Sequence, residues 1–439
     1  SPTNKLEISG GLVRCLGTAS ARFTVNNGAA EGFFGWNSGT LYLGGASALL
    51  NIAASGSNNI QLETNSSTRM TIKSDGDIEV GGNLKTNNLP GRNLIINGEF
   101  AIWQRGTTAI NMSQNKYMTD RFKAMSVTDG NGSIHQHTNV PTQVQTGGSQ
   151  FPYSLRVNCT TADTSLAAGQ YITVNHRIEG YNLRQLGFGL AGTRYATLSF
   201  WQRSPSGTYH VSFRNNSYNR YYIASYTAAS NTWEKHVITI PIDTTGTWES
   251  GNGMGLDIQW SLGCGSNNSG GTVGSWSSGS KHAGSSQKNF YDTVGNDFYL
   301  TGVQFEKGSI ATQFEHKSYA EDYNLCKRYY QQYPESPVAD TYTPLASSCV
   351  ACHSTTEAYW AMDFRPSLRT PPSFSHTGNL RANGSGVSNV ALTALGIYHN
   401  GTSSSFCYVR VASGFTAGIP CVISTNLDAT AAVKFEAEL

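Results

Sequence analysis

Residues 296–333 read NDFYLTGVQFEKGSIATQFEHKSYAEDYNLCKRYYQQY, and their hydrophobic period changes part-way along. Residues 298–305 are rich in β-branched and aromatic side chains, which predicts a strand. From Ser318 onward, aromatic and sulfur-containing side chains recur at positions 319, 323, 326 and 330, which places them on one face of a helix. Ser318 is the expected N-cap with Glu321 as its capping-box partner, and Pro334 is expected to end the helix. This is the one helix that we predict, so strands and turns have to form the rest of the chain.

The composition suits an all-β chain. The 439 residues include 47 Gly, 22 Tyr, 18 Phe and 8 Trp, and only 13% are charged, which favours many turns and uncharged polar surfaces. Lys and Arg number 30 against 28 Asp and Glu, so the net charge of +2 does not favour a nucleic acid or an acidic membrane surface. No apolar run is long enough to cross a bilayer. We therefore expect neither nucleic-acid binding nor membrane insertion.

Several separated segments carry a resemblance to a known family. Residues 93–106 read NLIINGEFAIWQRG, residues 119–122 read TDRF, residues 198–201 read LSFW, and further matches lie within 231–248 and 296–333. In this order they resemble a module of tailed-bacteriophage tail fibres, whose members typically read NLL(I)NGDF.IWQRG near the start and FE.R.Y..EL..C.RYY near the end. The resemblance covers roughly half of the chain. It implies a jelly-roll β-sandwich, similar to carbohydrate-binding modules, inside a homotrimeric fibre.

We divide the chain into four parts on this basis. Residues 1–92 are expected to form an N-terminal β-shaft, 93–316 the jelly-roll module, 317–333 a connector helix and 334–439 a C-terminal β head. The fold class is thus all-β, in a homotrimer. Strand-like pieces of the shaft are too short to enclose a core alone, so an intertwined shaft would pool the apolar faces of identical chains. A flexible linker is the alternative for this part.

The pattern predicts strands in three of these parts. In the shaft they are expected at 5–8, 21–25, 40–43, 59–62, 70–73 and 78–80. In the module they are expected at 92–96, 154–157, 171–174, 195–202, 210–213, 221–226, 234–240, 255–262 and 298–305. In the head they are expected at 347–354, 359–364, 391–398, 406–411 and 433–439. The Gly/Ser-rich residues 263–286 are expected to be an exposed loop.

Two features suggest a bound metal or haem, but their residues fit poorly. Residues 349–353 read CVACH and match the C-x-x-C-H haem motif. Strand alternation would point Cys349 and Cys352 to opposite faces, and no second pair has zinc spacing. Jelly-roll carbohydrate-binding modules often hold a structural calcium ion. Glu99 matches one end of that site, whereas Thr301-Gly302 stands where its Asp would be. We expect no metal site, no cofactor, and free thiols at the eight cysteines.

The sequence gives little support for an enzyme. No G-x-S-x-G elbow and no repeat of 20–50 residues is present. Five acidic residues lie where two could pair for glycoside cleavage: Asp120, Glu234, Asp243, Asp257 and Asp363. Any β protein has such residues, so we expect turn or surface roles for most of them.

Aromatic side chains near loops are the candidate glycan-binding residues, because aromatic rings pack against the apolar faces of sugars. The candidates are Tyr359, Trp360, Tyr398 and His399 in the head, and Trp276 within residues 263–286. Trp233 and Trp248 have two interpretations. They either cap the sandwich or, as loop residues, face a ligand.

These observations predict a phage receptor-binding protein. It would recognise a host-surface polysaccharide or outer-membrane receptor without catalysis, with affinity multiplied by three-fold avidity. It would be made in the host cytoplasm, act extracellularly as a virion tail fibre, and join other tail proteins through a part preceding Ser1. The alternatives are a tailspike-like glycan-degrading enzyme and a purely structural fibre component.

Overall fold

Strands dominate the part of the chain that the structure describes, as the predicted all-β class requires. The computed structural model describes residues 20–26, 31–37, 40–46, 59–64, 67–74, 78–80, 91–112, 116–335, 342–345, 350–384 and 387–439. The chain forms two compact units, Ser1–Leu84 and Lys85–Leu439.

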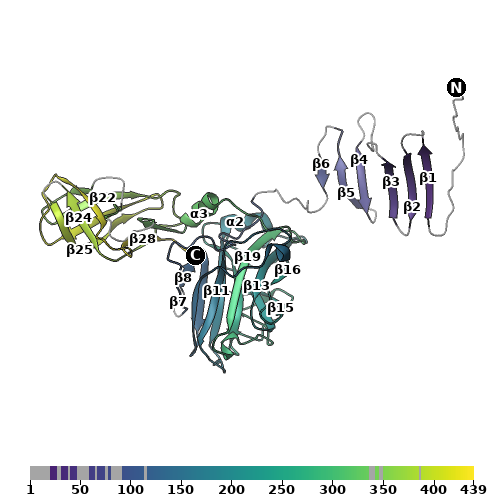
Figure 1. The fold of residues 1–439 in the computed structure, drawn as a ribbon, viewed down its shortest axis with the longest axis horizontal. Coiled ribbons are helices and arrows are strands. Elements are labelled where there is room, and N and C mark those ends of the chain that lie inside the picture. Colours follow the sequence, from purple (N-terminus) through teal and green to yellow (C-terminus); the bar gives the residue numbers. More distant parts are fainter. Residues whose placement is uncertain are drawn as a thin grey trace. The chain divides into compact units, whose positions relative to one another are not determined.

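The first unit contains two antiparallel sheets of three strands each (Figure 1). Their strands are β1 (Ser20–Asn26), β2 (Glu31–Asn37) and β3 (Thr40–Ala46), then β4 (Ile60–Thr64), β5 (Ser67–Ile72) and β6 (Ile78–Val80). Five predicted strands coincide with β1, β3, β4, β5 and β6. The sequence does not predict β2, and the expected strand at 5–8 lies outside the described residues. Leu62 and Ile78 are 52% and 59% exposed, so the second sheet buries little apolar surface within one chain.

The second unit begins with a β-sandwich of two antiparallel sheets (Figure 1). The six-stranded sheet has the order β16 (Glu234–Pro241), β13 (Tyr195–Arg203), β19 (Asp297–Lys307), β11 (Ser154–Thr161), β10 (Asn131–His137) and β7 (Ile110–Asn111). The seven-stranded sheet has the order β18 (Ser277–Ser278), β15 (Arg220–Ala228), β14 (Gly207–Arg214), β17 (Met254–Cys264), β12 (Tyr171–Glu179), β9 (Phe122–Val127) and β8 (Lys116–Thr119). Neighbours that are distant in sequence, such as β13 beside β19 and β12 beside β17, give the expected jelly-roll arrangement.

The core of the sandwich lies between the sheets. In β17, Leu256, Ile258 and Trp260 alternate with polar residues, and all three are fully buried. The Trp260 ring meets the ring of Phe200 from the facing sheet edge-on, with 5.7 Å between centroids. Eight of the nine strands that the sequence predicts for the module lie within observed strands.

The ninth predicted strand, at 92–96, is not a strand. These residues run beside β19 instead, and the Leu94 N–H donates to the Phe305 carbonyl at 2.9 Å. Residues 263–286 also differ from the expected exposed loop, because they pack against β14 and β15. His282 in this segment is only 7% exposed. A side chain at Gly271 would come within 2.4 Å of Ile223, so glycine allows this close approach.

The predicted helix is present but shorter than expected. Helix α3 spans Tyr319–Lys327, and the Ser318 hydroxyl accepts a hydrogen bond from the Glu321 N–H at 3.3 Å, which confirms the N-cap. The helix ends before Tyr330, because residues from Tyr330 onward form strand β20 (Tyr330–Tyr333) and pair with a strand from the end of the chain. The remaining helices are single turns, α1 (Gln143–Thr146), α2 (Gly180–Leu183), η1 (Arg184–Leu186) and η2 (Phe290–Asp292). Across the described residues, every helix is too short or too polar to span a membrane.

The predicted head contains a closed six-stranded barrel (Figure 1). Its strands follow the order β21 (Val350–Cys352), β22 (Glu357–Asp363), β26 (Ser404–Val411), β25 (Val387–Asn400), β24 (Leu380–Gly384) and β27 (Pro420–Thr425). The sequence predicts β22, β25 and β26 well. It does not predict β24 or β27, whose ends contain Gly, Asn and Pro.

A small sheet closes the base of the head. Strand β28 (Ala432–Glu436) lies between β20 and β23 (Ser373–Thr377), antiparallel to both. The strand that leads into the head and the strand that leaves it are therefore direct neighbours.

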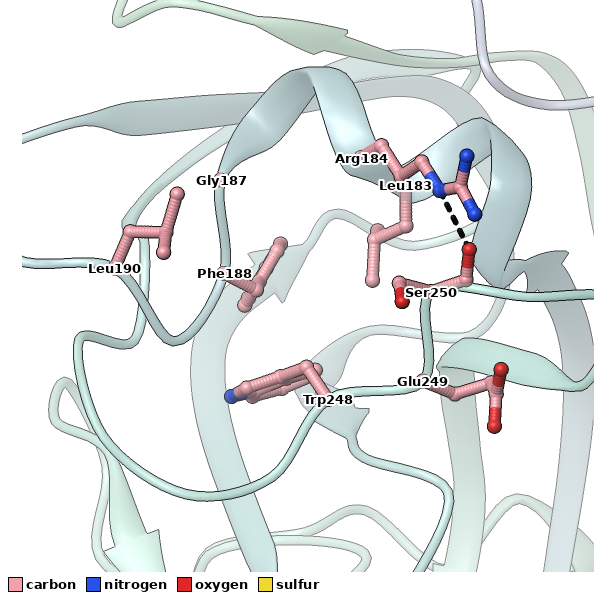
Figure 2. Close-up of a pocket in the computed structure, with 8 residues that line it drawn as sticks. All are labelled: Leu183, Arg184, Gly187, Phe188, Leu190, Trp248, Glu249 and Ser250. Atoms are coloured by element: carbon pink, nitrogen blue, oxygen red, sulfur yellow. Dashed lines mark hydrogen bonds between the residues drawn. The ribbon is translucent and has the colours of Figure 1, made fainter.

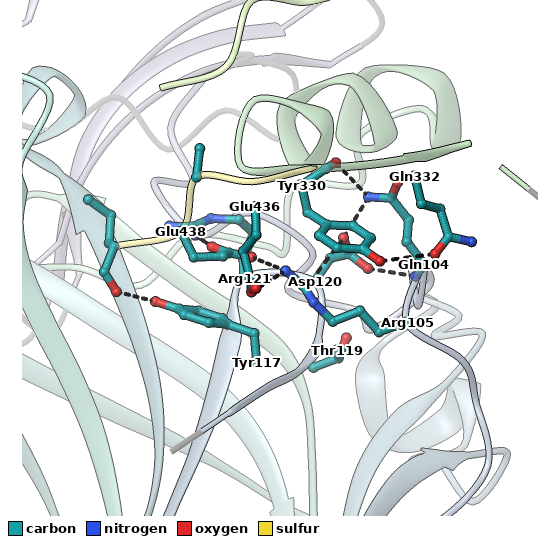
Figure 3. Close-up of polar contacts among 12 residues, drawn as sticks. Gln104, Arg105, Tyr117, Thr119, Asp120, Arg121, Tyr330, Gln332, Glu436 and Glu438 are labelled. Atoms are coloured by element: carbon teal, nitrogen blue, oxygen red, sulfur yellow. Dashed lines mark hydrogen bonds and ion pairs between the residues drawn. The ribbon is translucent and has the colours of Figure 1, made fainter. Parts of the chain in front are cut away.

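The last four residues, Glu436–Leu439, continue onto the sandwich, and we call this contact the junction (Figure 3). The Glu438 carboxylate forms ion pairs with Arg121 and, at 3.2 Å, with Arg105. The Tyr117 hydroxyl donates to the Leu439 carbonyl at 2.6 Å. The side chains of Arg121 and Glu438 are 1% and 5% exposed, so the pair is buried.

The motifs that carry the family resemblance meet at the junction. The Asn97 amide Nδ2 donates to the Thr119 hydroxyl at 3.0 Å and to the Asp120 carbonyl at 3.1 Å. The Asn97 backbone N–H donates to the Asp322 carboxylate on α3. The guanidinium carbon of Arg121 lies 3.5 Å from the centroid of the Tyr329 ring. Segments far apart in the sequence thus form one polar network beneath the head.

Candidate functional site

One outer face of the barrel gathers aromatic side chains. In β26 the residues facing inward are buried, whereas Phe406, Tyr408 and Arg410 point outward. In the neighbouring β22, Glu357 and Tyr359 point outward in the same way and lie opposite Arg410 and Tyr408. Tyr398 of β25 completes the group at the site of a register shift. We call these six residues the tyrosine face.

The rings of the tyrosine face contact one another. Tyr398 lies 4.6 Å from Tyr408 and 5.6 Å from Tyr359, measured between ring centroids, and Tyr359 lies 5.5 Å from Phe406. Tyr398 and Phe406 are 42% and 39% exposed. The barrel therefore presents a continuous aromatic surface to solvent.

Glu357 organises the polar centre of this face. Its carboxylate accepts hydrogen bonds from the hydroxyls of Tyr359 at 2.8 Å and Tyr398 at 2.7 Å, and from Arg410 Nε at 2.8 Å. Arg410 Nη2 also donates to the Tyr398 hydroxyl at 2.9 Å. The hydrogen bonds from Tyr398, Tyr359 and Arg410 lower the pKa of Glu357. Because Tyr359 donates to this carboxylate, its own pKa rises to about 12.

A glycine makes room for one of the rings. An added Cβ at Gly396 of β25 would lie 2.6 Å from the Tyr408 hydroxyl and 2.7 Å from its Cζ atom. Gly396 pairs with Tyr408 across the two strands, so the ring lies over bare backbone. The position of Tyr408 thus depends on a missing side chain.

The structure brings three of the predicted site residues together. Tyr359 and Tyr398 belong to the tyrosine face, and the exposed His399 stacks on Phe406 at 6.3 Å. Trp360 lies inside the barrel and is 4% exposed, so our expectation that it is a surface aromatic is wrong. Strand alternation explains this difference, because Tyr359 and Trp360 are consecutive and have to point to opposite faces.

Trp276 lies in the sandwich, apart from the tyrosine face. Its ring is half-buried against Phe188, Trp248 and Tyr222, and its Nε1 donates to the Pro241 carbonyl at 2.7 Å. It therefore supports its neighbours instead of standing free in a loop. Trp233 is also half-buried, and its Nε1 donates to Asn139 at 3.0 Å.

Sequence reasoning missed Glu357, Phe406, Tyr408 and Arg410. Phe406, Tyr408 and Arg410 pair directly with outward residues of β22, and this pairing between strands cannot be read from either strand alone. A signal was nevertheless present, because Phe406, Tyr408 and Arg410 alternate with apolar residues along a predicted strand. Period-two alternation would have placed all three on one face.

The residues of the C-x-x-C-H motif do not form a metal site in the described part of the chain. Cys352 is buried within β21, whereas His353 is exposed and packs 4.9 Å from the Tyr359 ring. Cys349 lies outside the described residues. Elsewhere among the described residues, no three His, Cys, Asp or Glu side chains group closely enough to hold a metal ion. The thiols of Cys159, Cys264, Cys326, Cys352 and Cys407 form no disulfide.

The residues around Glu99 do not fit a calcium ion. Lys317 Nζ donates to the carbonyls of Asn93 at 3.1 Å and Ile95 at 3.0 Å. Glu99 accepts from His316 at 2.9 Å. The Lys317 ammonium group thus binds backbone oxygens near Glu99, and its positive charge disfavours a calcium ion there.

Most of the acidic residues considered for catalysis hold structural contacts. Asp243 pairs with Arg220 at 2.8 Å, and Asp257 pairs with Arg214 at 2.7 Å. Asp120 accepts from the Gln104 N–H at 2.8 Å and lies 3.8 Å from Arg105. These three carboxylates are each satisfied by a neighbour within the sandwich or the junction.

No family model matches the sequence, and no curated relative matches it. Among solved structures, the enzymatically active domain of bacteriophage CBA120 tailspike protein 4 is 13% identical over 49% of this chain and 21% of that chain, with a TM-score of 0.27. A CBM4 carbohydrate-binding module is 12% identical over 48% and 99%, with a TM-score of 0.23. A family 11 carbohydrate-binding module of a Clostridium thermocellum cellulosomal cellulase is 11% identical over 48% and 98%, with a TM-score of 0.24. The chain thus spans about a fifth of the tailspike's length. These low scores carry no argument, and the jelly-roll assignment rests on the strand order.

Proposed function

We propose that this chain is the non-catalytic, glycan-binding part of a phage tail fibre, and that the tyrosine face contacts the host glycan. The observation that carries the proposal is the exposed group of Tyr359, Tyr398, Phe406 and Tyr408 around Glu357 and Arg410. The resemblance of the module motifs to tail fibres supports the biological setting.

The chemistry of the face suits a sugar ring. The aromatic rings offer apolar surface to the C–H side of the ring, and their hydroxyls exchange hydrogen bonds with the sugar hydroxyls. Arg410 can only donate hydrogen bonds and the ionised Glu357 can only accept them. A sugar hydroxyl, which both donates and accepts, therefore finds a partner for each role. The mutual hydrogen bonds fix these side chains before binding, which lowers the entropy lost on contact.

The same geometry favours binding over cleavage. Glycoside hydrolysis generally uses two carboxyl groups, one of them protonated as the general acid. Glu357 is the one carboxylate of the tyrosine face, and its lowered pKa keeps it ionised at neutral pH. We therefore expect retention of glycan without release of product.

Exposed apolar residues of the first unit support a homotrimer. Leu62, Ile78 and Val80 stand on strands β4 and β6 and are at least 36% exposed in one chain. Packing against identical chains would bury them. Light scattering should then give three times the mass of one chain, and a stable monomer would contradict the trimer.

A glycan array tests the proposal. We expect the purified protein to retain at least one host-surface polysaccharide, and Tyr398→Ala to weaken that retention. Tyr195→Ala is the matched control, because Tyr195 lies on the sandwich and is 41% exposed against 42% for Tyr398. Equal effects of the two substitutions would overturn the assignment to the tyrosine face. Release of oligosaccharide would favour the tailspike-like alternative.

A further inference from the structure

The sandwich carries a pocket of about 280 Å³ at one end (Figure 2). It is lined by residues of α2, η1 and two loops: Leu183, Arg184, Gly187, Phe188, Leu190, Trp248, Glu249 and Ser250. Phe188 and Trp248 face each other with 4.3 Å between their ring centroids. Leu190, which also lines the pocket, is 60% exposed. The pocket is thus largely aromatic and aliphatic, and it lies on a different domain from the tyrosine face.

Hydrogen bonds from Arg194 fix the first loop of the pocket, residues 187–191. Arg194 donates to the carbonyls of Gly187 at 2.9 Å, Ala191 at 3.1 Å and Leu190. Gly189 has a φ of +78°, and a Cβ there would lie 3.3 Å from the Trp248 ring. Glycine therefore lets the loop turn sharply while passing close to Trp248.

The second loop is fixed by separate contacts. The buried Asp243 accepts a bidentate pair from Arg220 at 2.8 and 2.9 Å, and its carbonyl accepts from the Gly189 N–H at 2.8 Å. Trp248 Nε1 donates to the Thr245 carbonyl at 2.9 Å. The ring of Trp276 supports Trp248 edge-on at 5.4 Å. The pocket is therefore preorganised without a ligand.

Two charged groups of opposite sign stand at the rim. Arg184 Nε donates to the Ser250 carbonyl at 2.6 Å (Figure 2). Its two terminal nitrogens have no hydrogen-bond partner among the described residues. Glu249 Oε1 accepts from the Gly251 N–H at 2.6 Å, and Oε2 has no partner in the same part of the chain. The rim thus offers free donors on Arg184 and a free acceptor on Glu249.

We infer that this pocket is a second sugar-binding site, of a size that fits one hexose ring. Its volume lies just below the range of about 300–1,000 Å³ typical of sites for larger ligands. The apolar face of the ring packs against Trp248, and neighbouring hydroxyls accept from Arg184 and donate to Glu249. Glu249 would repel a sugar carboxylate and Arg184 would attract one, so the rim as a whole gives a uronic acid no advantage over a neutral sugar. The site is independent of the tyrosine face and does not rest on it.

Ligand-observed saturation-transfer NMR on the full chain tests this inference. The probes are the methyl glycosides of glucose, galactose and mannose, with methyl glucuronide as the acidic comparison. We expect at least one neutral probe to bind with a Kd of about 1 mM. Arg184→Ala should weaken its binding about fivefold, because a donor is lost. Trp248→Ala should remove the signal.

Two control variants should leave sugar binding in the pocket unchanged. Arg203→Ala is the control for Arg184→Ala, because Arg203 Nε likewise donates to a loop carbonyl, that of Asn231, at 2.9 Å. It should leave binding unchanged. Tyr398→Ala should also leave it unchanged, which separates this site from the tyrosine face. Absence of binding by every neutral probe, tighter binding of the glucuronide, or equal losses for Arg184→Ala and Arg203→Ala would each overturn the inference.

Discussion

The junction and the tyrosine face use the same chemistry in opposite environments. The junction combines Arg121, Glu438 and Tyr117, and the tyrosine face combines Arg410, Glu357 and Tyr398. The side chains of the first ion pair are 1% and 5% exposed, and those of the second are 48% and 18% exposed. A buried charge depends on its partner, whereas water can replace the partner of an exposed one. The same three residue types therefore join two domains in one place and remain available to a ligand in the other.

Removing one carboxylate at the junction should have the largest effect. Glu438→Gln leaves Arg121 and Arg105 buried with less compensation, and we expect a loss of about 3–5 kcal/mol in the free energy of unfolding. Calorimetry or urea denaturation would measure it. Glu436→Gln is the control, because Glu436 also pairs with Arg105 but is 44% exposed. Similar losses of stability for the two variants would show that burial does not decide how much each ion pair contributes.

The pH dependence should have opposite signs in the two regions. Burial raises the pKa of Asp120 near the junction to about 6, above its usual 3.8. The ionised form is therefore disfavoured in the folded chain, and stability from this group falls as the pH rises from about 4 to about 6. For Glu357 the pKa is lowered, so its contribution is present above the usual pKa and is lost as the pH falls through the lowered value.

Asp120→Asn isolates the first of these effects. Relative to the unchanged chain, the free energy of unfolding of the variant should rise by about 2 kcal/mol between pH 4 and pH 7, because the variant lacks the buried carboxylate. Denaturation at the two pH values measures this difference. A constant difference between variant and parent would contradict the raised pKa.

These contrasts show what the sequence could predict. Alternation along residues 404–411 and 357–363 is local, so it predicts the barrel strands and, applied strictly, the outward side of Tyr359 and the inward side of Trp360. The junction joins Arg121 to Glu438 across more than 300 residues, and no local period carries that pairing. The early end of helix α3 has the same cause, since Tyr330 pairs with Glu436 of β28.

Gly396→Ala should disturb the tyrosine face through packing. The new methyl group would collide with the far end of the Tyr408 side chain, which lies on the outer face and can shift, so we expect the free energy of unfolding to fall by less than about 1 kcal/mol. Glycan retention should fall as well, because Tyr408 moves. Gly169→Ala is the control, since Gly169 is exposed and a Cβ there meets no atom within 4 Å. If Gly396→Ala behaves like this control, Tyr408 does not depend on the glycine.

Deleting one hydroxyl in each region gives the finest test. Tyr117→Phe removes the bond to the Leu439 carbonyl and should lower the free energy of unfolding by about 1 kcal/mol without changing glycan retention. Tyr398→Phe should leave the unfolding midpoint unchanged and weaken retention about threefold. Denaturation and array measurements on both variants decide the matter. The reverse pattern would exchange the roles assigned to the two regions.

The pairing of β20 with β28 has a consequence for how this protein can change. Because the chain enters and leaves the barrel on adjacent antiparallel strands, its two attachment points lie only about 5 Å apart across the sheet. A domain whose own ends lie equally close could replace residues 334–431 if it also supplied a strand in place of β23 and a donor in place of Arg369, which binds the carbonyls of Ala437 and Glu438. The barrel could thus be exchanged as one unit. Exchange at these two strands would replace the barrel and its tyrosine face while leaving the strands of the sandwich unchanged.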